Sequence, residues 1–475
     1  MTTTTNTEGR RLTGRLGPVG IVFMVVAAAA PLTVIGGNMP LAMGLGNGAG
    51  APVGFVIAAL VLLVFSIGFV TMTPYVPEAG AFFSYVTVGL GERMGKGIAV
   101  VALIAYTAIQ IGIYGYIGWA ISDTVAHYHG PELPWPVYSF AVLAIVAVLG
   151  YRHIELSAKV LGVALALEIG IVVILDVVMV AKPSPAGVTF ASFDPGVFTQ
   201  GTIGIAILFA LTGFIGFEAT AVFRDEARDP ERTIPRATYA AVVIIGAFYA
   251  ITVWAFVVAI GPDQVSAVAQ RTLDGDGNML LDTTGDMLGT VGRDIVNVLL
   301  LTSLFACVLS FHNVIARYQF VLAGKGLLPA RLAKVHDDHA SPSFSSVVQT
   351  VTAAIIVGVL AILGIDPLVG VFGSMAGIAT VGMVVLMLTT SIAVLVFFLR
   401  NRDRVPNRLW ATRIAPALAV LGLLGSLWLV LSNFTLVTGG SATLSTILAA
   451  IPFVGLIVGF LAWRPSRSLS SAAAE

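Results

Sequence analysis

The sequence predicts an all-α polytopic membrane protein with 12 transmembrane helices. Three observations lead to this fold class. Of the 475 residues, 57% are hydrophobic and only 11% are charged, whereas about 25% of the residues in a soluble domain are charged. The apolar residues gather in twelve segments near the length, roughly 20 residues, that a helix needs to cross a bilayer. Lysine and arginine fall almost entirely in alternate connections between these segments.

In chain order, the predicted spans are residues 18–45, 51–72, 95–127, 135–150, 155–181, 198–222, 238–260, 294–322, 346–364, 369–399, 414–433 and 443–463. The polar residues 1–17 and 464–475 are expected to be tails. With the N-terminus placed inside, every lysine and arginine except Lys182, Arg271 and Arg293 falls on the inner side. Cytoplasmic loops carry the excess of positive charge, so we expect both termini in the cytoplasm and a location in the cell membrane.

The composition also excludes several classes of function. A formal net charge of zero gives no basis for binding nucleic acid. The single cysteine, Cys307, cannot form a disulfide within the chain or supply a cysteine metal cluster. The sequence contains no phosphate-binding loop, zinc motif or nucleophile elbow. We therefore expect no enzymatic activity, no metal and no cofactor, with membrane lipid as the surrounding solvent.

The sixth span carries the clearest sign of a site. Its apolar run contains Gly213, Gly216 and Glu218. Glycine weakens a helix, and a carboxylate in hydrocarbon costs about 3 kcal/mol or more. Both are tolerated only where the helix opens against protein or a water-filled cavity. Secondary transporters hold their substrates at interrupted helices of this kind, so we expect the site of a transporter here.

The first span is predicted to be interrupted as well. Pro31 removes a backbone donor and clashes with the preceding turn, and Gly36, Gly37 and Pro40 follow it. The freed amides after the break can face an anion, although a proline kink without a ligand is an equal alternative. Spans 1 and 6 each begin a unit of five helices, residues 18–181 and 198–399. The two units start on opposite sides of the membrane, so the repeat is expected to be inverted, with residues 414–463 outside it.

Three sets of motifs point to a known family. Gly213-Phe-Ile-Gly-Phe-Glu218 is followed by Glu226-Ala-Arg-Asp-Pro-Glu-Arg-Thr-Ile-Pro-Arg236. Asn313-Val-Ile-Ala-Arg317 precedes Gly324-Lys-Gly-Leu-Leu-Pro329, and Pro77-Glu-Ala-Gly80 precedes Phe83-Ser-Tyr85. The sequence closely resembles the amino acid–polyamine–organocation (APC) superfamily of permeases in these motifs, which are spread over the first ten spans.

The resemblance implies a 5+5 inverted repeat (LeuT-like) with broken helices 1 and 6 and two appended helices. It implies an amino acid or related amine bound between the breaks. On helix 6 the break starts at Thr212 and Gly213, and the resemblance assigns the backbone of Phe214, Ile215 and Gly216 to the ammonium group and the gate. On helix 1, Pro31-Leu32-Thr33-Val34 stands where the family has Gly-Ser-Gly-Val. We expect this departure to change the shape of the carboxylate-binding backbone.

The resemblance also selects candidate coupling groups. Glu168 stands where several family members carry a lysine on helix 5, and Thr302 and Ser303 stand where sodium-coupled relatives supply ligands. Glu168 is expected to take up a proton, to hold a cation, or to be a hydrogen-bonded structural group. Glu218 resembles a family position implicated in proton coupling or in tying helices together.

Two further intramembrane groups are expected to be less involved. Asp176 lies toward the outer end of the fifth span, where it can reach water. His312 lies near the inner end of the eighth span, where a structural histidine is the more common case.

The expected function is therefore secondary active import of an amino acid or related organic amine by alternating access. Coupling is expected to protons through Glu168 or Glu218, with Na⁺ as the alternative ion. An exchanger of amino acids or polyamines is a second expectation, and a sensor without flux is a third. The protein is expected to be a monomer or a homodimer.

Overall fold

The structure is a computed structural model, and it describes residues 17–76, 82–152, 158–218, 220, 227–334, 342–402, 408–439 and 441–462. These residues form helices and connections and contain no β-strand. The longer helices are α1 (Pro18–Ala28), α4 (Ala51–Met72), α5 (Phe82–Leu90), α6 (Glu92–His127), α7 (Trp135–Tyr151), α8 (Ala158–Ala181), α10 (Ile203–Thr212), α12 (Pro230–Ile260), α13 (Val265–Leu273), α14 (Met279–Gly324), α15 (Ser343–Ile362), α16 (Ser374–Arg400), α17 (Ala415–Ser432) and α19 (Ala442–Leu461). Shorter turns of helix are α2 (Pro31–Thr33), η1 (Val34–Asn38), α3 (Met39–Leu41), η2 (Ala42–Asn47), α9 (Pro195–Phe198), η8 (Pro367–Gly373) and α18 (Phe434–Val437).

Nine helical stretches in the described part of the chain are long and apolar enough to cross a membrane. One of them, Pro18–Tyr75, contains two of the predicted spans, and α7 and α10 are shorter apolar helices that coincide with two more. The outer faces are also apolar, as Leu421, Trp428 and Ile447 illustrate with exposures of 65%, 69% and 57%. Large exposed apolar side chains on most of the long helices, among them α4, α8, α12, α14, α15, α17 and α19, require a lipid solvent, so the chain is a multi-pass membrane protein.

Several helices extend beyond the predicted spans. The eighth span was expected over residues 294–322, but α14 begins at Met279, where the Asn278 side chain accepts a hydrogen bond from the Leu281 N–H at 3.1 Å. Gly289 has a φ of 74° and kinks this helix. The seventh span was expected from residue 238, but α12 begins at Pro230, since proline is well tolerated in a first helical turn. The extra turns are polar, and hydropathy alone therefore misses them.

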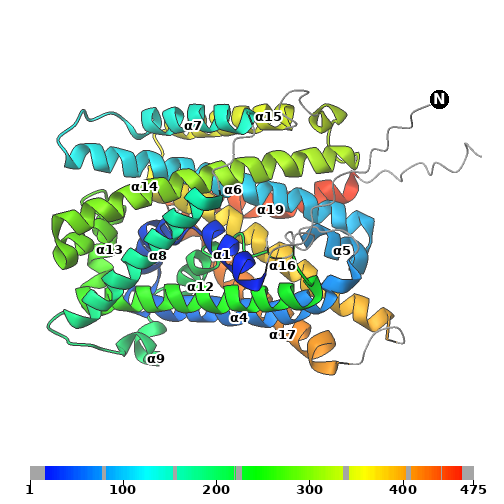
Figure 1. Cartoon of the computed structure of the whole chain (residues 1–475), viewed down its shortest axis with the longest axis horizontal. Coiled ribbons are helices and arrows are strands. Elements are labelled where there is room, and N and C mark those ends of the chain that lie inside the picture. The colour runs from blue at the N-terminus through cyan, green and yellow to red at the C-terminus, as the bar shows by residue number, and fades with distance from the viewer. Residues whose placement is uncertain are drawn as a thin grey trace, which may run out of the picture.

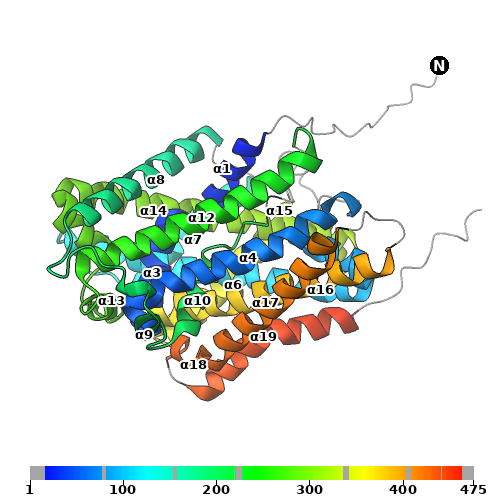
Figure 2. The ribbon, with the colours of Figure 1, turned by 90° about the horizontal axis from the view of Figure 1, so that it is seen from below.

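Two long helices, α6 and α14, run through the molecule, and α7 and α15 pack against them on one side (Figure 1). In the perpendicular view, α8 and α12 lie along one edge and α17 and α19 along the opposite edge (Figure 2). The first helix is divided into α1, α2 and the turns that follow, and it packs against α12, α8 and α14. The start of helix 1 therefore lies at the edge formed by α8 and α12, and α2 packs against α14.

The last helix, α19, packs tightly against α6 through glycine. A Cβ atom added at Gly459 would lie 2.8 Å from Gly97 Cα and 2.8 Å from the Lys96 carbonyl oxygen. Likewise, on α6, a Cβ atom added at Gly97 would lie 2.8 Å from the carbonyl oxygen of Leu456 in α19. Because these neighbours are backbone atoms, which cannot rotate away, the contact requires glycine on both helices.

We expect Gly459→Ala to destabilise the protein by about 1–3 kcal/mol, the usual range for overpacking. Thermal unfolding of the purified protein in detergent measures the effect. Gly425→Ala in α17 is the matched control, because a Cβ there meets nothing within 4 Å and alanine favours a helix by about 1 kcal/mol. Equal unfolding temperatures for the two variants would contradict the packing described here.

Candidate functional site

Helix 1 is interrupted between α1 and α2. The helix ends at Ala28 and resumes at Pro31, and Ala30 between them adopts a left-handed conformation with φ 46° and ψ 72°. Pro31 has no N–H, so it starts the second half without leaving a donor unpaired. A left-handed alanine costs roughly 1–2 kcal/mol, so the surrounding structure holds this break in place. Strain of this kind is concentrated at functional sites.

The sixth predicted span, residues 198–222, is called helix 6 and is distinct from α6. It is interrupted directly after α10. The backbone N–H groups of Phe214 and Ile215 each donate to a carbonyl three residues back, both at 3.1 Å, so the chain tightens instead of continuing as an α-helix. Gly216 then takes a φ of 107°, which a residue with a Cβ rarely adopts. The glycines of the motif therefore allow the helix to open at mid-segment.

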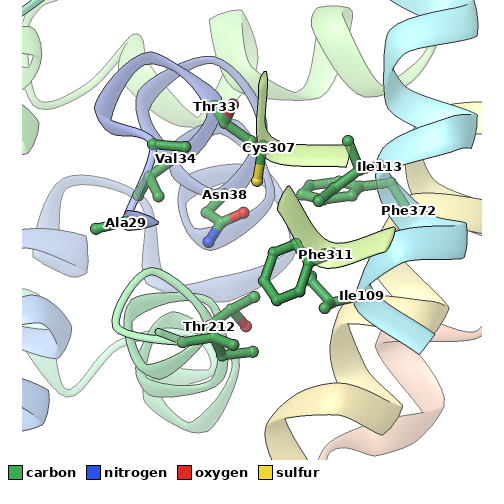
Figure 3. Close-up of a pocket in the computed structure, with 12 residues that line it drawn as sticks. Ala29, Thr33, Val34, Asn38, Ile109, Ile113, Thr212, Cys307, Phe311 and Phe372 are labelled. Atoms are coloured by element: carbon green, nitrogen blue, oxygen red, sulfur yellow. The ribbon is translucent and has the colours of Figure 1, made fainter. Parts of the chain in front are cut away.

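The two interruptions face each other across a small cavity (Figure 3). The Asn38 side chain donates a hydrogen bond to the Phe209 carbonyl at 3.0 Å and so joins helix 1 to α10. The cavity is lined by Ala29, Ala30, Thr33, Val34, Asn38, Ile109, Ile113, Thr212, Ile215, Cys307, Phe311 and Phe372. Helices 1 and 6 supply seven of these twelve residues, so the cavity lies directly beside the two breaks.

The cavity is apolar apart from a few polar groups. Thr33, Asn38 and Thr212 are its polar side chains, and no charged side chain is among its lining residues. Its volume is about 30 Å³, and a water molecule needs roughly 10–15 Å³ measured in this way. The cavity as it stands holds one or two waters, so a larger guest requires its walls to separate.

Glu168 of α8 reaches the break in helix 1. Its carboxylate accepts hydrogen bonds from the Ser303 hydroxyl at 3.0 Å and from the backbone N–H of Leu32. The Thr33 hydroxyl lies 3.5 Å from that of Ser303. The first amides of a helical segment carry a partial positive charge, so the carboxylate of Glu168 caps the second half of helix 1.

Glu218 closes the break in helix 6. One carboxylate oxygen accepts the Tyr106 hydroxyl at 2.5 Å, and the other accepts the backbone N–H of Gly216 at 3.0 Å. The backbone N–H of Glu218 itself is a third donor to this carboxylate. Three donors satisfy a buried carboxylate, and the Tyr106 bond fixes the break to α6.

The predicted site residues fall into three groups. Thr33, Val34, Thr212 and Ile215 line the cavity, whereas Pro31, Leu32, Gly213, Phe214 and Gly216 form the breaks without lining it. Glu168 meets Ser303, but the exposed Thr302 donates its hydroxyl to the Leu299 carbonyl at 2.9 Å and does not join them. Of the two hydroxyls offered as possible sodium ligands, only that of Ser303 lies beside Glu168 in this structure, because neighbouring residues point to different sides of a helix.

His312 lies outside the cavity, in a buried network. Its Nε2 is 2.8 Å from the Ser346 hydroxyl and its Nδ1 is 3.4 Å from the Gln110 amide. Gln349 donates to Gln110 at 2.6 Å and accepts from Gln319 at 3.1 Å. Both ring nitrogens of His312 have a partner, so the side chain fits the structural role expected from the sequence.

Apart from Ala29 and Ala30 at the break itself, six lining residues were not predicted from the sequence: Asn38, Ile109, Ile113, Cys307, Phe311 and Phe372. Asn38 could have been found, because a lone amide inside an apolar span is a functional candidate. The others lie on helices that are apolar on all sides, where no pattern marks the face turned to a cavity. Of the motifs, Pro77–Gly80 and Glu226 lie outside the described residues, whereas residues 227–236 are described and lead into α12.

The comparison with known sequences covers nearly the whole chain. The profile of the amino acid permease family matches residues 16–460. The chain belongs to the amino acid permease family. This membership agrees with the resemblance seen in the motifs of helices 2, 6 and 8.

Individual members of this family are distant in sequence. The branched-chain amino acid permease BcaP of Bacillus subtilis is 24% identical over 314 residues, which are 62% of this chain and 64% of that protein. BcaP of Lactococcus lactis is 22% identical over 403 residues, 80% of this chain and 81% of that protein. The serine/threonine exchanger SteT of Bacillus subtilis is 24% identical over 379 residues, 76% and 77% of the two chains. The chain thus aligns with less than two-thirds of the length of the first of these permeases.

We expect Tyr106→Phe to lower the free energy of unfolding by about 1.5–3 kcal/mol, because it removes a hydrogen bond to a buried carboxylate. Tyr318→Phe is the matched control, since the Tyr318 hydroxyl is buried without a hydrogen-bond partner among the described residues. Thermal unfolding in detergent compares the two variants. If Tyr106→Phe is no less stable than Tyr318→Phe, the hydrogen bond from Tyr106 to Glu218 does not fix the break in helix 6 to α6.

Proposed function

We propose that the protein is a secondary active transporter that imports a neutral, apolar amino acid across the cell membrane by alternating access. One observation carries this proposal: the two interrupted helices enclose a cavity that combines the polar side chains of Thr33, Asn38 and Thr212 with apolar side chains. Such a cavity matches the two parts of an amino acid. Family membership and the names of the cited relatives support transport and not enzymatic activity.

The main chain of the substrate would bind at the breaks. Thr33 is the third residue of the second half of helix 1, so its N–H has no acceptor within the helix and can bind a carboxylate together with its hydroxyl. The end of α10 offers carbonyl groups at the negative end of a helix, and these can bind the ammonium group. Half-helix ends hold charged substrate groups in this way in secondary transporters.

The side chain of the substrate would lie among the apolar residues. Ile109 and Ile113 of α6, Phe311 of α14 and Phe372 of η8 form this wall. A charged side chain would be buried there without a partner, at a cost of several kcal/mol. Two relatives are named branched-chain amino acid permeases, and this supports a branched aliphatic substrate.

We assign proton coupling to Glu168. The carboxyl group caps the half-helix that would bind the substrate carboxylate, so its protonation removes a competing negative charge from that site. Glu218 has three donors and a fixed position, which suits a structural clamp. Sodium is a weaker proposal, because Thr302 directs its hydroxyl away from Glu168 and Ser303.

The finer architecture is also a proposal. We infer 12 spans with both termini in the cytoplasm, arranged as two inverted units of five helices followed by two more. The charge distribution of the loops and the paired interruptions of helices 1 and 6 support this topology. A monomer or a homodimer remains the expected assembly.

Exchange of two amino acids is the second candidate function. The relative named a serine/threonine exchanger favours it, since its alignment covers 76% of this chain. An exchanger would need no ion gradient, whereas a proton symporter accumulates substrate against a gradient only when protons flow with it.

The test is uptake by proteoliposomes of the purified protein. We expect an inward proton gradient to drive uptake of L-leucine, with unlabelled L-isoleucine and L-valine competing and L-lysine and L-glutamate not competing, since neither charge finds a partner in the cavity. Glu168→Gln should abolish the effect of the proton gradient and leave leucine counterflow intact. Glu132→Gln, in an exposed connection, is the matched control.

Competition by L-lysine equal to that by L-isoleucine would contradict the proposed substrate class. Gradient-driven accumulation that survives in Glu168→Gln would contradict the assignment of coupling to this residue. Counterflow of leucine without any response to protons in the unchanged protein would favour the exchanger.

A further inference from the structure

A second intramembrane carboxyl group lies apart from the cavity. Asp176 of α8 is buried, with 9% of its surface exposed. Its Oδ2 accepts a hydrogen bond from the Thr252 hydroxyl of α12 at 2.8 Å. Its Oδ1 is buried and has no hydrogen-bond partner among the described residues. The sequence suggested that Asp176 reaches water, and the structure shows instead that the helix interface encloses it.

No ion pair among the described residues includes Asp176. Three charged groups at this end have other partners: Lys182 donates to the Met287 carbonyl at 3.3 Å, Arg293 lies 3.8 Å from Asp282, and Asp294 accepts the Tyr128 hydroxyl. Asp286 is the other acidic side chain at this end of α14. The segments α1 and α2, which also pack on α8, carry no titratable side chain. The other charged side chains lie toward the opposite ends of their helices: Glu231, Arg232 and Arg236 on α12, and Arg317 on α14 with Lys325 at its C-terminal cap. Along the α8–α12 interface, Tyr249 and Glu168 are the titratable groups between Asp176 and the break in helix 1.

The surroundings fit a proton better than a metal ion. A hard cation takes about six oxygen ligands, whereas Asp176 and Thr252 offer two side chains, and the described residues contain no group of three or more His, Cys, Asp or Glu that could hold a metal. A buried carboxylate with a single donor is costly. A carboxylic acid with its proton on Oδ1 keeps the Thr252 hydrogen bond on Oδ2 and avoids the buried charge.

Two polar side chains of α12 lie along the interface between Asp176 and the break in helix 1. Tyr249 and Thr252 are three residues apart on α12 and so lie on one face of it. The Tyr249 hydroxyl donates to the Ala29 carbonyl at 3.1 Å, and Tyr249 interacts electrostatically with Glu168. Glu168 lies eight residues from Asp176 on α8, which is about 12 Å along the helix. The rest of this interface is apolar, with Val172 and Leu175 buried between the two acids.

We propose that Asp176 is a second proton-binding site, which takes up a proton from the outer side on Oδ1. Its role in uptake rests on the proposed proton-coupled transport, whereas proton binding itself does not. Thr252 positions the carboxyl group by holding Oδ2, so that Oδ1 stays free for the proton.

Infrared difference spectra of the purified protein in proteoliposomes, recorded after a pH jump, test proton binding without any transport. We expect the carbonyl band of a protonated carboxyl group to change with pH, to lose one component in Asp176→Asn and to regain it in Asp176→Glu. Asn keeps the acceptor for Thr252 and nearly the same volume, so the fold is retained, and thermal unfolding verifies this. Asp263→Asn, at an exposed aspartate outside α8 and α12, is the matched control and should keep the component that Asp176→Asn loses.

Uptake of L-leucine at varied outer pH and constant inner pH then tests the role. Asp176→Asn should lose the dependence on outer pH and retain counterflow at equal pH, and Thr252→Val should shift this dependence without abolishing it. Unchanged infrared spectra in Asp176→Asn would overturn the proposal. An Asp176 band in a protein that shows no proton-driven uptake would uphold the binding site and refute only the proposed transport.

Discussion

The bilayer requires every backbone polar group within it to find a partner inside the protein, and the rest of this structure follows from how two interrupted helices meet that requirement. The break at Ala29–Ala30 is completed by Glu168, which accepts the Leu32 N–H, and by Tyr249, which donates to the Ala29 carbonyl. The break after Thr212 is completed by Glu218, which accepts the Gly216 N–H. Each interruption thus brings a carboxylate to the middle of an apolar protein, and the cavity lies where the two interruptions meet.

The buried acids differ in the number of their partners, and their roles follow from this difference. Glu218 has three donors and is fixed to α6 by Tyr106, so it maintains the shape of the break in helix 6. Glu168 has two donors, and both come from groups beside the cavity, so any change in its charge alters the surface that meets a ligand. Asp176 has one donor and a free oxygen. Fewer donors stabilise a buried negative charge less, and the proposed roles, a clamp for Glu218 and proton binding for Glu168 and Asp176, follow this order.

The sequence predicted the two interruptions because proline and glycine act locally: Pro31 has no N–H, and Gly216 takes a φ that other residues avoid. It did not predict that the left-handed residue would be Ala30, since no local rule favours alanine there. Ser303 and Thr302 were equivalent in sequence, but only one of two neighbours can face Glu168. The walls supplied by Ile109, Ile113 and Phe311 could not be predicted, because α6 and α14 are apolar on several faces and only tertiary packing decides which face lines a cavity.

The most direct test of the central claim, that a small neutral amino acid binds between the two breaks, uses Cys307. This residue lines the cavity and is the only cysteine in the sequence, so a small thiol reagent reports on the cavity alone, and Cys307→Ser gives the background. The measurement is the rate of Cys307 modification with and without a concentration of L-leucine that saturates the thermal shift of the protein. The account predicts that leucine slows the modification severalfold, because ligand and reagent compete for the same space. A rate that saturating leucine leaves unchanged would place the binding site elsewhere and contradict the account.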